Sequence, residues 1–150
     1  MQRHSSTSQT GRPFTSCDSR VLLAFLFAHP SFNQLQSDAH RFQGFTEAHP
    51  EHIIVELREP ILVRDMRGDM RDHNGDPEKD AIFEIRLRSS SQIRRAKTNE
   101  KGQFKIRHVP AGTYDFKATL DGFQSVVGTV IVSKTADPKA RIKLTLNLGV

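Results

Sequence analysis

The first group of residues that could do chemistry is an acid-rich stretch between Asp65 and Asp80. Carboxylate oxygens are the ligands that calcium prefers in proteins. The loop reads DHNGDPEKD, however, and this order does not match the EF-hand pattern. Because Asn74-Gly75 and Asp76-Pro77 are both strong turn dipeptides, we expect a solvated turn here. The acids concerned are Asp69, Asp72, Asp76, Glu78 and Asp80.

Histidine is the second residue type that could do chemistry, with seven in the chain. His49 and His52 lie on either side of Glu51 and could share one metal ion. A zinc site needs three or four ligands, each oriented by further hydrogen bonds, and no such set accompanies this pair. We therefore expect a polar linker at this point, and no metal or cofactor in the chain.

Ser, His and Asp also occur in the combination used by hydrolases, but without a catalytic motif. The chain has no G-x-S-x-G elbow, no H-E-x-x-H helix and no P-loop. His108 lies at the end of a predicted strand, where we expect it to face solvent. The sequence thus predicts that the chain is not an enzyme.

Basic residues are in excess, with a formal net charge of +5. From Ile61 onward 17 Lys and Arg stand against 11 Asp and Glu. The charges alternate with acids and apolar residues, which favours a solvated outer sheet face over a block of basic residues. A basic strand face and the turns at 73–80 and 99–102 are the candidate contact points. The basic candidates are Arg86, Arg88, Lys105 and Arg107.

The N-terminal region is polar up to residue 20 and carries the only cysteine, Cys17, so no intrachain disulfide can form. Val21–Ala28 then reads VLLAFLFA, too short to cross a bilayer but suited to the apolar part of a signal peptide. We expect export to the periplasm or cell envelope. If this segment is instead a short buried helix, a cytoplasmic location follows.

Past Pro60 the chain changes to short alternating segments separated by turn signals, the pattern of a β-sandwich or barrel. The piece at 53–58 is strand-like, but Pro60 confines it to a sheet edge. We predict an all-β, seven-stranded Greek-key sandwich of immunoglobulin or transthyretin type over 53–150, preceded by a largely disordered leader and linker over 1–52. The seven strands are expected at 61–71, 81–88, 93–98, 103–109, 113–120, 126–132 and 141–148.

Several short motifs in this region resemble those of carboxypeptidase regulatory-like, or transthyretin-like, domains. They are an N-G-x-P turn, a T-x-x-x-G-x-F turn, a P-x-G-x-Y corner and a G-F pair, in the order and spacing of the family. The resemblance covers about 61–148 and is weakest in the first strand, where Met70 replaces the usual Val. The matching residues are Gly75, Thr98, Gly102, Phe104, Pro110, Gly112, Tyr114, Gly122 and Phe123.

These motif residues have structural reasons to be present. Gly102 and Gly112 permit positive φ, and Phe104 and Tyr114 suit core positions at the ends of sheets. The resemblance implies an accessory domain for protein interaction or scaffolding, with another protein or an envelope polysaccharide as partner and without nucleic acid or a transmembrane segment. A carbohydrate-binding module is the alternative, because starch-binding-like sandwiches share the architecture. The chain has no Trp, and we expect its single Tyr to be buried, which disfavours sugar stacking.

Overall fold

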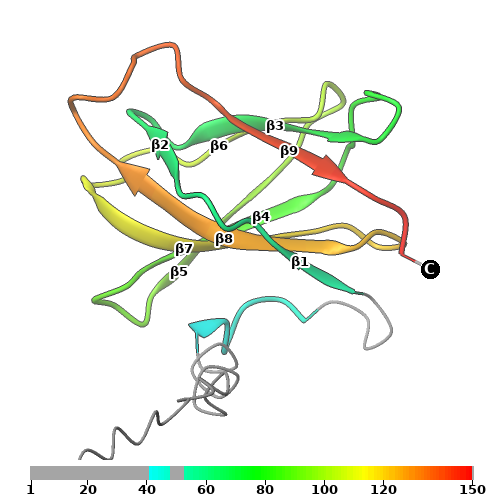
Figure 1. The fold of residues 1–150 in the computed structure, drawn as a ribbon, viewed down its shortest axis with the longest axis horizontal. Helices are drawn as coiled ribbons and strands as arrows, with labels where there is room; N and C mark the ends of the chain where they lie inside the picture. The colour runs from blue at the N-terminus through cyan, green and yellow to red at the C-terminus, as the bar shows by residue number, and fades with distance from the viewer. Residues whose placement is uncertain (1–40, 48–52, 150) are drawn as a thin grey trace, which may run out of the picture. The chain divides into compact units, whose positions relative to one another are not determined.

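The computed structural model describes residues 41–47 and 53–149, and this part of the chain is built from β-strands (Figure 1). It confirms the all-β sandwich, with nine strands in place of the seven expected. The strands are β1 (Ile54–Glu56), β2 (Ile61–Val63), β3 (Arg67–Asp72), β4 (Ile82–Leu87), β5 (Ile93–Lys97), β6 (Gln103–Lys105), β7 (Gly112–Thr119), β8 (Ser125–Val132) and β9 (Ile142–Leu146).

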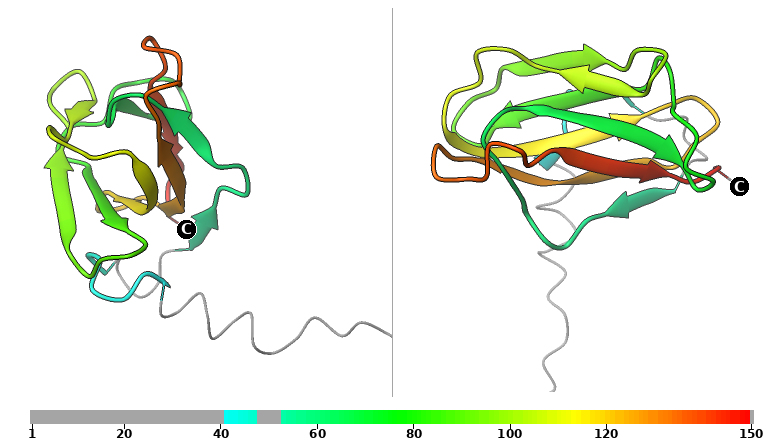
Figure 2. Two further views of the ribbon diagram at one scale, coloured as in Figure 1. Left: turned by 90° about the vertical axis from the view of Figure 1, so that its left-hand side faces the viewer. Right: turned by 90° about the horizontal axis from the view of Figure 1, so that it is seen from above.

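The strands form two sheets that pack face to face (Figure 2). Sheet A has the order β1-β8-β7-β4-β5, with β2 also pairing along β8. Sheet B has the order β6-β3-β9. The pairings of β1 and β2 with β8, and of β3 with β9, are parallel, and the others are antiparallel. The piece before Pro60 is therefore the edge strand β1.

The first predicted strand, 61–71, is two strands in different sheets, and this corrects the sequence interpretation. Its buried residues are Val63 and Met66, three apart, followed by Gly68 and Met70. A single strand places alternate residues on one face, so a spacing of three breaks its period. β2 ends at Val63, and its pairing with β8 ends there too. Met66 is then buried between the two sheets, and the chain continues in sheet B as β3.

The core lies between the two sheets and is centred on three phenylalanines. Phe83 stacks on Phe104 at a centroid distance of 4.2 Å and on Phe116 at 5.4 Å. These rings come from β4, β6 and β7, so the core joins sheet A to sheet B. Met70, which replaces the family's usual Val, is fully buried in the same cluster.

The motif residues position the turns and the core as the sequence indicates. The Thr98 hydroxyl accepts a hydrogen bond from the Ala81 amide at 2.9 Å, and the Tyr114 hydroxyl donates one to the Pro110 carbonyl at 2.9 Å. Phe104 and Tyr114 are 4% and 3% exposed, which confirms both as core residues. Phe123 forms a β-bridge with Leu148 that closes this end of the domain.

The glycines of the motifs differ in their backbone conformation. Gly102 has a φ of 70°, and a Cβ there would lie 2.4 Å from the Met70 carbonyl oxygen, so the turn requires glycine. Gly75 and Gly122 also have positive φ. Gly112 also has a positive φ, of 159°, as the sequence predicts, and an added Cβ there would lie 2.9 Å from the Leu87 side chain.

Residues 41–47, here called the strap, lie against the outer face of sheet A (Figure 1). Phe45 is only 4% exposed, and the Arg86 guanidinium lies 5.1 Å from the centre of its ring. Thr46 binds Glu84 on β4, and Arg41 binds Asp115 on β7. Part of the segment interpreted as a linker therefore contacts the sandwich. The N-terminal apolar segment and the His49/His52 pair lie outside the described residues.

Candidate functional site

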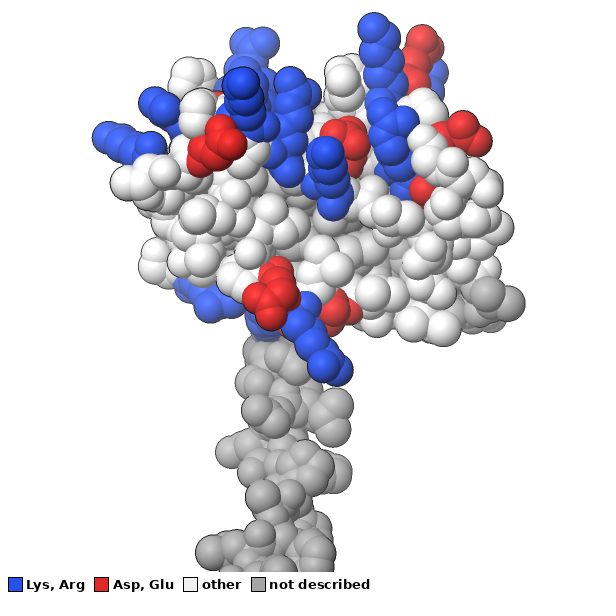
Figure 3. Space-filling model, turned by 45° about the horizontal axis from the view of Figure 1, so that its top comes forward, with Lys and Arg blue, Asp and Glu red and all other residues white. Residues whose placement is uncertain are grey.

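The outer face of sheet B is strongly basic, and we call it the basic face. Alternation along the strands turns Gly68, Met70 and Phe104 inward and leaves charged neighbours outside. Figure 3 shows Lys and Arg side chains gathered along the side of the domain where sheet B lies, with fewer acids among them. The outward residues are Arg67, Asp69, Arg71, Gln103, Lys105, Arg141, Lys143 and Thr145.

Three cations on this face occupy one row across the strands, which we call the cation row. Arg67 on β3 is the direct register partner of Lys105 on β6. Arg141 directly precedes Ile142, the β9 partner of Gly68, and so continues the row on the other side of Arg67. Like charges directly opposite each other in a sheet repel and destabilise it. The row thus concentrates positive charge at positions where repulsion between the side chains opposes the pairing of the strands.

Few acids neutralise the basic face. Asp69 pairs with Arg71 at 3.4 Å, and the exposed Asp65 lies 3.8 Å from Arg67. Among the described residues, no ion pair involves Lys105, Arg141 or Lys143. The face therefore has positive charge available for an anion.

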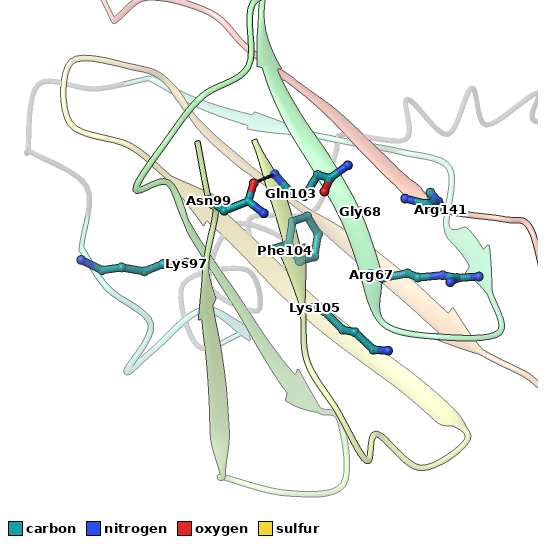
Figure 4. Close-up of a pocket in the computed structure, with 8 residues that line it drawn as sticks. All are labelled: Arg67, Gly68, Lys97, Asn99, Gln103, Phe104, Lys105 and Arg141. Carbon is teal, nitrogen blue, oxygen red and sulfur yellow. Dashed lines mark hydrogen bonds between the residues drawn. The ribbon is translucent and has the colours of Figure 1, made fainter. Parts of the chain in front are cut away.

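A pocket of about 370 Å³ lies where the cation row meets the turn between β5 and β6, here called the β5–β6 turn. Figure 4 shows Phe104 near its centre, with Arg67, Lys105 and Arg141 on one side and Lys97 on the opposite rim; the side chains of Arg67, Lys105 and Lys97 extend away from the Phe104 ring. Gly68 also lines it. An added Cβ at Gly68 would lie 2.8 Å from Phe104 and 2.1 Å from the Ile142 carbonyl oxygen, so glycine keeps the sheet close to the core at this point.

The Asn99 side chain at this pocket is held in place by the β5–β6 turn. Its Oδ1 accepts hydrogen bonds from the backbone amides of Lys101, at 2.9 Å, and Gln103, at 3.0 Å (Figure 4). Its amide N–H groups donate to no described residue. Arg67 donates through Nη2 to the Pro138 carbonyl at 2.5 Å, and its buried Nε has no partner among the described atoms. The pocket therefore presents hydrogen-bond donors.

The four basic residues proposed from the sequence as ligand contacts do not form one surface. Lys105 belongs to the cation row, and Arg107 follows β6 at another hollow that Lys105 and His108 also line. Arg86 and Arg88 lie on the outer face of sheet A, where the strap lies. Arg86 donates to the Gln43 carbonyl at 2.8 Å and Arg88 to Asp115 at 3.1 Å, so both stabilise the domain itself.

A second charged cluster lies beneath the strap on sheet A. Glu84 on β4 is fully buried and accepts hydrogen bonds from the Thr46 amide at 2.7 Å, the Thr46 hydroxyl at 3.0 Å and Arg95. Lys117 is the cross-strand partner of Glu84. Burial lowers the pKa of Lys117, while the charge of Glu84 opposes that shift. The carboxylate at its centre is fully buried and hydrogen-bonded, so we assign this cluster to stability.

Asp115 is the other carboxylate of this covered face. It accepts hydrogen bonds from Arg41 at 2.8 Å and from Arg88 at 3.1 Å. The slight burial of Arg41 would lower its pKa, but its bonds to Asp115 and Glu56 raise it overall. A strap residue and a sheet residue thus share one carboxylate.

The acid-rich turn satisfies its own hydrogen bonds, in agreement with a solvated turn. Asp72 accepts from the backbone amides of Asn74, at 2.9 Å, and Asp76, at 2.8 Å. Desolvation would raise the pKa of Asp72, but these bonds lower it overall. Desolvation, followed by the charges of Asp72 and Asp76, raises the pKa of Glu78. Within the described residues, no group of three or more His, Cys, Asp or Glu could hold a metal ion.

Sequence reasoning missed most of the basic face. The alternation at 141–148 places Arg141 and Lys143 on one side of a strand, but it does not say which strands lie beside them. The parallel pairing of β3 with β9 joins residues more than 70 positions apart and brings Arg67 next to Arg141. Only the register reveals the cation row.

Within the described residues, the structure has no helix long and apolar enough to cross a membrane.

Comparison with solved structures identifies two enzymes of low similarity. Chlorocatechol 1,2-dioxygenase from Pseudomonas putida matches 77% of this chain and 76% of its own, with 10% identity and a TM-score of 0.41. 3-Chlorocatechol 1,2-dioxygenase from Rhodococcus opacus 1CP matches 78% of each chain with the same identity and TM-score. A comparison with curated protein sequences finds no match.

This result corrects the expectation that the chain is not an enzyme. That expectation rested on the absence of three catalytic motifs, which does not exclude catalysis by other residues, and both matched structures are enzymes. At this level of similarity the comparison assigns no activity to the chain.

A protein-family model gives a more specific match. The model of the carboxypeptidase regulatory-like domain matches residues 65–146, more than half of the chain. The matched range runs from β3 to β9 and includes the Thr98–Gly102 turn, the Pro110–Tyr114 corner and the core phenylalanines. The chain therefore belongs to the carboxypeptidase regulatory-like domain family.

Proposed function

We propose that this domain is a protein-interaction or scaffold module that binds an acidic surface of a partner protein through its basic face. The cation row carries this proposal, because its three side chains lie in cross-strand register and two of them, Lys105 and Arg141, form no ion pair within the described residues. An acidic partner would offset the repulsion within the row. Complementary charge of this kind raises association rates and fixes orientation.

The composition of the basic face favours a protein partner over a sugar or a single-stranded nucleic acid. Sugars and unpaired bases are normally recognised by exposed aromatic side chains, and none of the outward residues of sheet B is aromatic. Tyr114 is buried at its corner and Phe104 lies beneath the sheet. Recognition by charge and hydrogen bonding suits a surface rich in Asp and Glu. The carbohydrate-binding alternative therefore has no observation in its favour.

We further propose that the domain acts at the cell envelope after export. This proposal rests on the apolar run Val21–Ala28 with Arg3, Arg12 and Arg20 before it, which lies outside the described residues. The test is the intact mass of the protein recovered from the periplasm. A mass lacking the N-terminal segment supports export, whereas a full-length mass confined to the cytoplasm contradicts it.

The binding proposal is tested with a fluorescent glutamate-rich peptide as the acidic probe. The variant Arg67→Gln/Lys105→Gln/Arg141→Gln should weaken binding at least about tenfold at low salt, because it removes the cation row. The control, Arg58→Gln/Lys79→Gln/Lys134→Gln, removes the same charge from exposed positions outside the basic face and should change affinity by less than about twofold. Fluorescence anisotropy measures both.

The salt dependence provides a second readout. Binding through exposed charges should weaken steeply between low and physiological salt. Equal affinities of the two triple variants would contradict the proposal. So would binding to a neutral polysaccharide that the peptide does not displace.

A further inference from the structure

The pocket beside the cation row differs from the rest of the basic face because the β5–β6 turn directs an uncharged donor toward it. Both hydrogen bonds accepted by Asn99 Oδ1 come from backbone amides of this turn and of the start of β6. The amide N–H groups are consequently the free end of this side chain. Lys97 and Lys105 carry donors only, as do Arg67 and Arg141. Among the polar side chains at this pocket, Gln103 also offers an acceptor in its terminal amide, whereas the acceptor of Asn99 is already occupied.

We propose that this pocket is an oxyanion subsite that binds a phosphate monoester carried by the partner protein. The inference rests on the proposed function, since it assigns a ligand to one part of the basic face. A phosphorylated side chain brings a charge of about −1.5 to −2 and three strong acceptor oxygens. A carboxylate brings a single charge and two oxygens. Four cations and an amide donor line this pocket, and they match the charge and the oxygens of a phosphate better than those of a carboxylate.

The position and size of the pocket suit a ligand attached to a larger molecule. Its volume of about 370 Å³ exceeds that of a few water molecules, which occupy about 30 Å³ each in the liquid. It opens on the outer face of the domain, between the β5–β6 turn and the cation row (Figure 4). Arg67 adds a further feature, because its Nε is buried without a hydrogen-bond partner among the described atoms. An anion above the row would lie close to that group.

The variant Asn99→Asp separates binding from folding. Aspartate keeps an Oδ1 acceptor for the amides of Lys101 and Gln103, so the β5–β6 turn should form as before. It removes the two N–H donors and adds a negative charge inside the pocket. Lys134→Gln, in the exposed β8–β9 loop, removes one positive charge elsewhere and is the matched control for the change in net charge.

The experiment is an NMR titration of the full chain with sodium phosphate, compared with sodium chloride at equal ionic strength. In the native protein, phosphate should shift the side-chain amides of Asn99 and Gln103 saturably, and Asn99→Asp should weaken this binding at least about tenfold. Lys134→Gln should titrate like the native protein. If chloride reproduces the shifts, or if Asn99→Asp binds phosphate as tightly as the native chain, the subsite does not exist.

Peptides of one sequence with Ser, Glu or phosphoserine at the central position test the attached form. The phosphoserine peptide should bind at least about tenfold more tightly than the Glu peptide, and Asn99→Asp should remove this difference. Equal affinities would overturn the subsite. If phosphoserine is not preferred while the glutamate-rich peptide still requires the cation row, the subsite fails and the proposed function stands. If the pocket binds phosphate but neutralising the cation row leaves acidic-peptide binding unchanged, the proposed function fails.

Discussion

The structure changes the interpretation of Glu84 more than that of any other residue discussed above. It alternates with Phe83 and Ile85 on β4, so its side chain leaves the core, yet it is fully buried under the strap. Arg95 on β5 and Lys117 on β7 lie opposite it in register, and Thr46 donates to it from above. These partners stabilise the fold as a set, because losing one of them would leave the buried Glu84 carboxylate incompletely paired.

Glu84→Gln should lower the free energy of unfolding by about 2 kcal/mol, since hydrogen bonds to charged groups contribute about 1.5–3 kcal/mol each. The glutamine retains an acceptor for Thr46 but turns an N–H group toward Arg95 or Lys117. Urea denaturation measures the change. Glu100→Gln is the control, because Glu100 is 83% exposed and its pair with Lys79 is solvated. Equal effects of the two substitutions would show that the Glu84 cluster does not stabilise the fold.

The sequence predicted the motif residues better than it predicted Glu84. Gly102, Phe104 and Tyr114 are set by local geometry, namely a tight turn, an inward strand position and a corner hydrogen bond. Glu84 depends on what covers the sheet. Strict alternation of β4 assigns its face, but no local pattern indicates that a segment about 40 residues earlier packs on it.

At the scale of elements, the strap extends the folded unit beyond the range that the family model matches. Arg41 donates to Asp115 on β7 at 2.8 Å, to Thr129 on β8 at 2.8 Å and to Glu56 on β1 at 2.7 Å. One side chain thus joins three strands of sheet A. Phe45 adds apolar burial at the other end of the strap. Without these residues, the outer face of sheet A would expose Glu84, Asp115 and Lys117 to water.

Phe45→Ala should lower the free energy of unfolding by about 3 kcal/mol, the low end for removing a buried aromatic ring. It should also speed hydrogen exchange at the Thr46 amide, which donates to Glu84. Leu62→Ala, at a 53% exposed position, is the control and should change stability by less than about 0.5 kcal/mol. A Phe45→Ala protein with native stability and native protection of Thr46 would mean that the strap does not hold this face.

The split between β2 and β3 shows why the sequence did not predict the full topology. The composition of 61–71 is that of one strand, and only the three-residue spacing from Val63 to Met66 marks the crossing between sheets. That crossing places β3 between β6 and β9, where Arg67 meets Lys105 and Arg141. The basic face is therefore a product of long-range pairing, which a single sequence does not reveal.

At the scale of the whole molecule, binding and stability should oppose each other on the basic face. The positive charge of the domain is concentrated where strand pairing sets cations side by side, and cross-strand repulsion of this kind costs about 0.2–1 kcal/mol per pair. On the outer face of sheet A, in contrast, the carboxylates of Glu84 and Asp115 are buried and paired with arginines. Charge thus has a different role on each face. On sheet A it stabilises the fold, and on the basic face it provides a positive potential that attracts an anion.

Arg141→Gln should therefore raise the free energy of unfolding by about 0.5 kcal/mol at low salt while it weakens binding of the glutamate-rich peptide. The gain comes from relieved repulsion with Arg67, so it should vanish near 1 M salt, where the screening length is about 3 Å. Thermal unfolding at both salt concentrations measures it, with Lys134→Gln as the control. A gain that persists at high salt, or a loss at low salt, would mean that Arg141 contributes through packing and that the cation row is not under electrostatic strain.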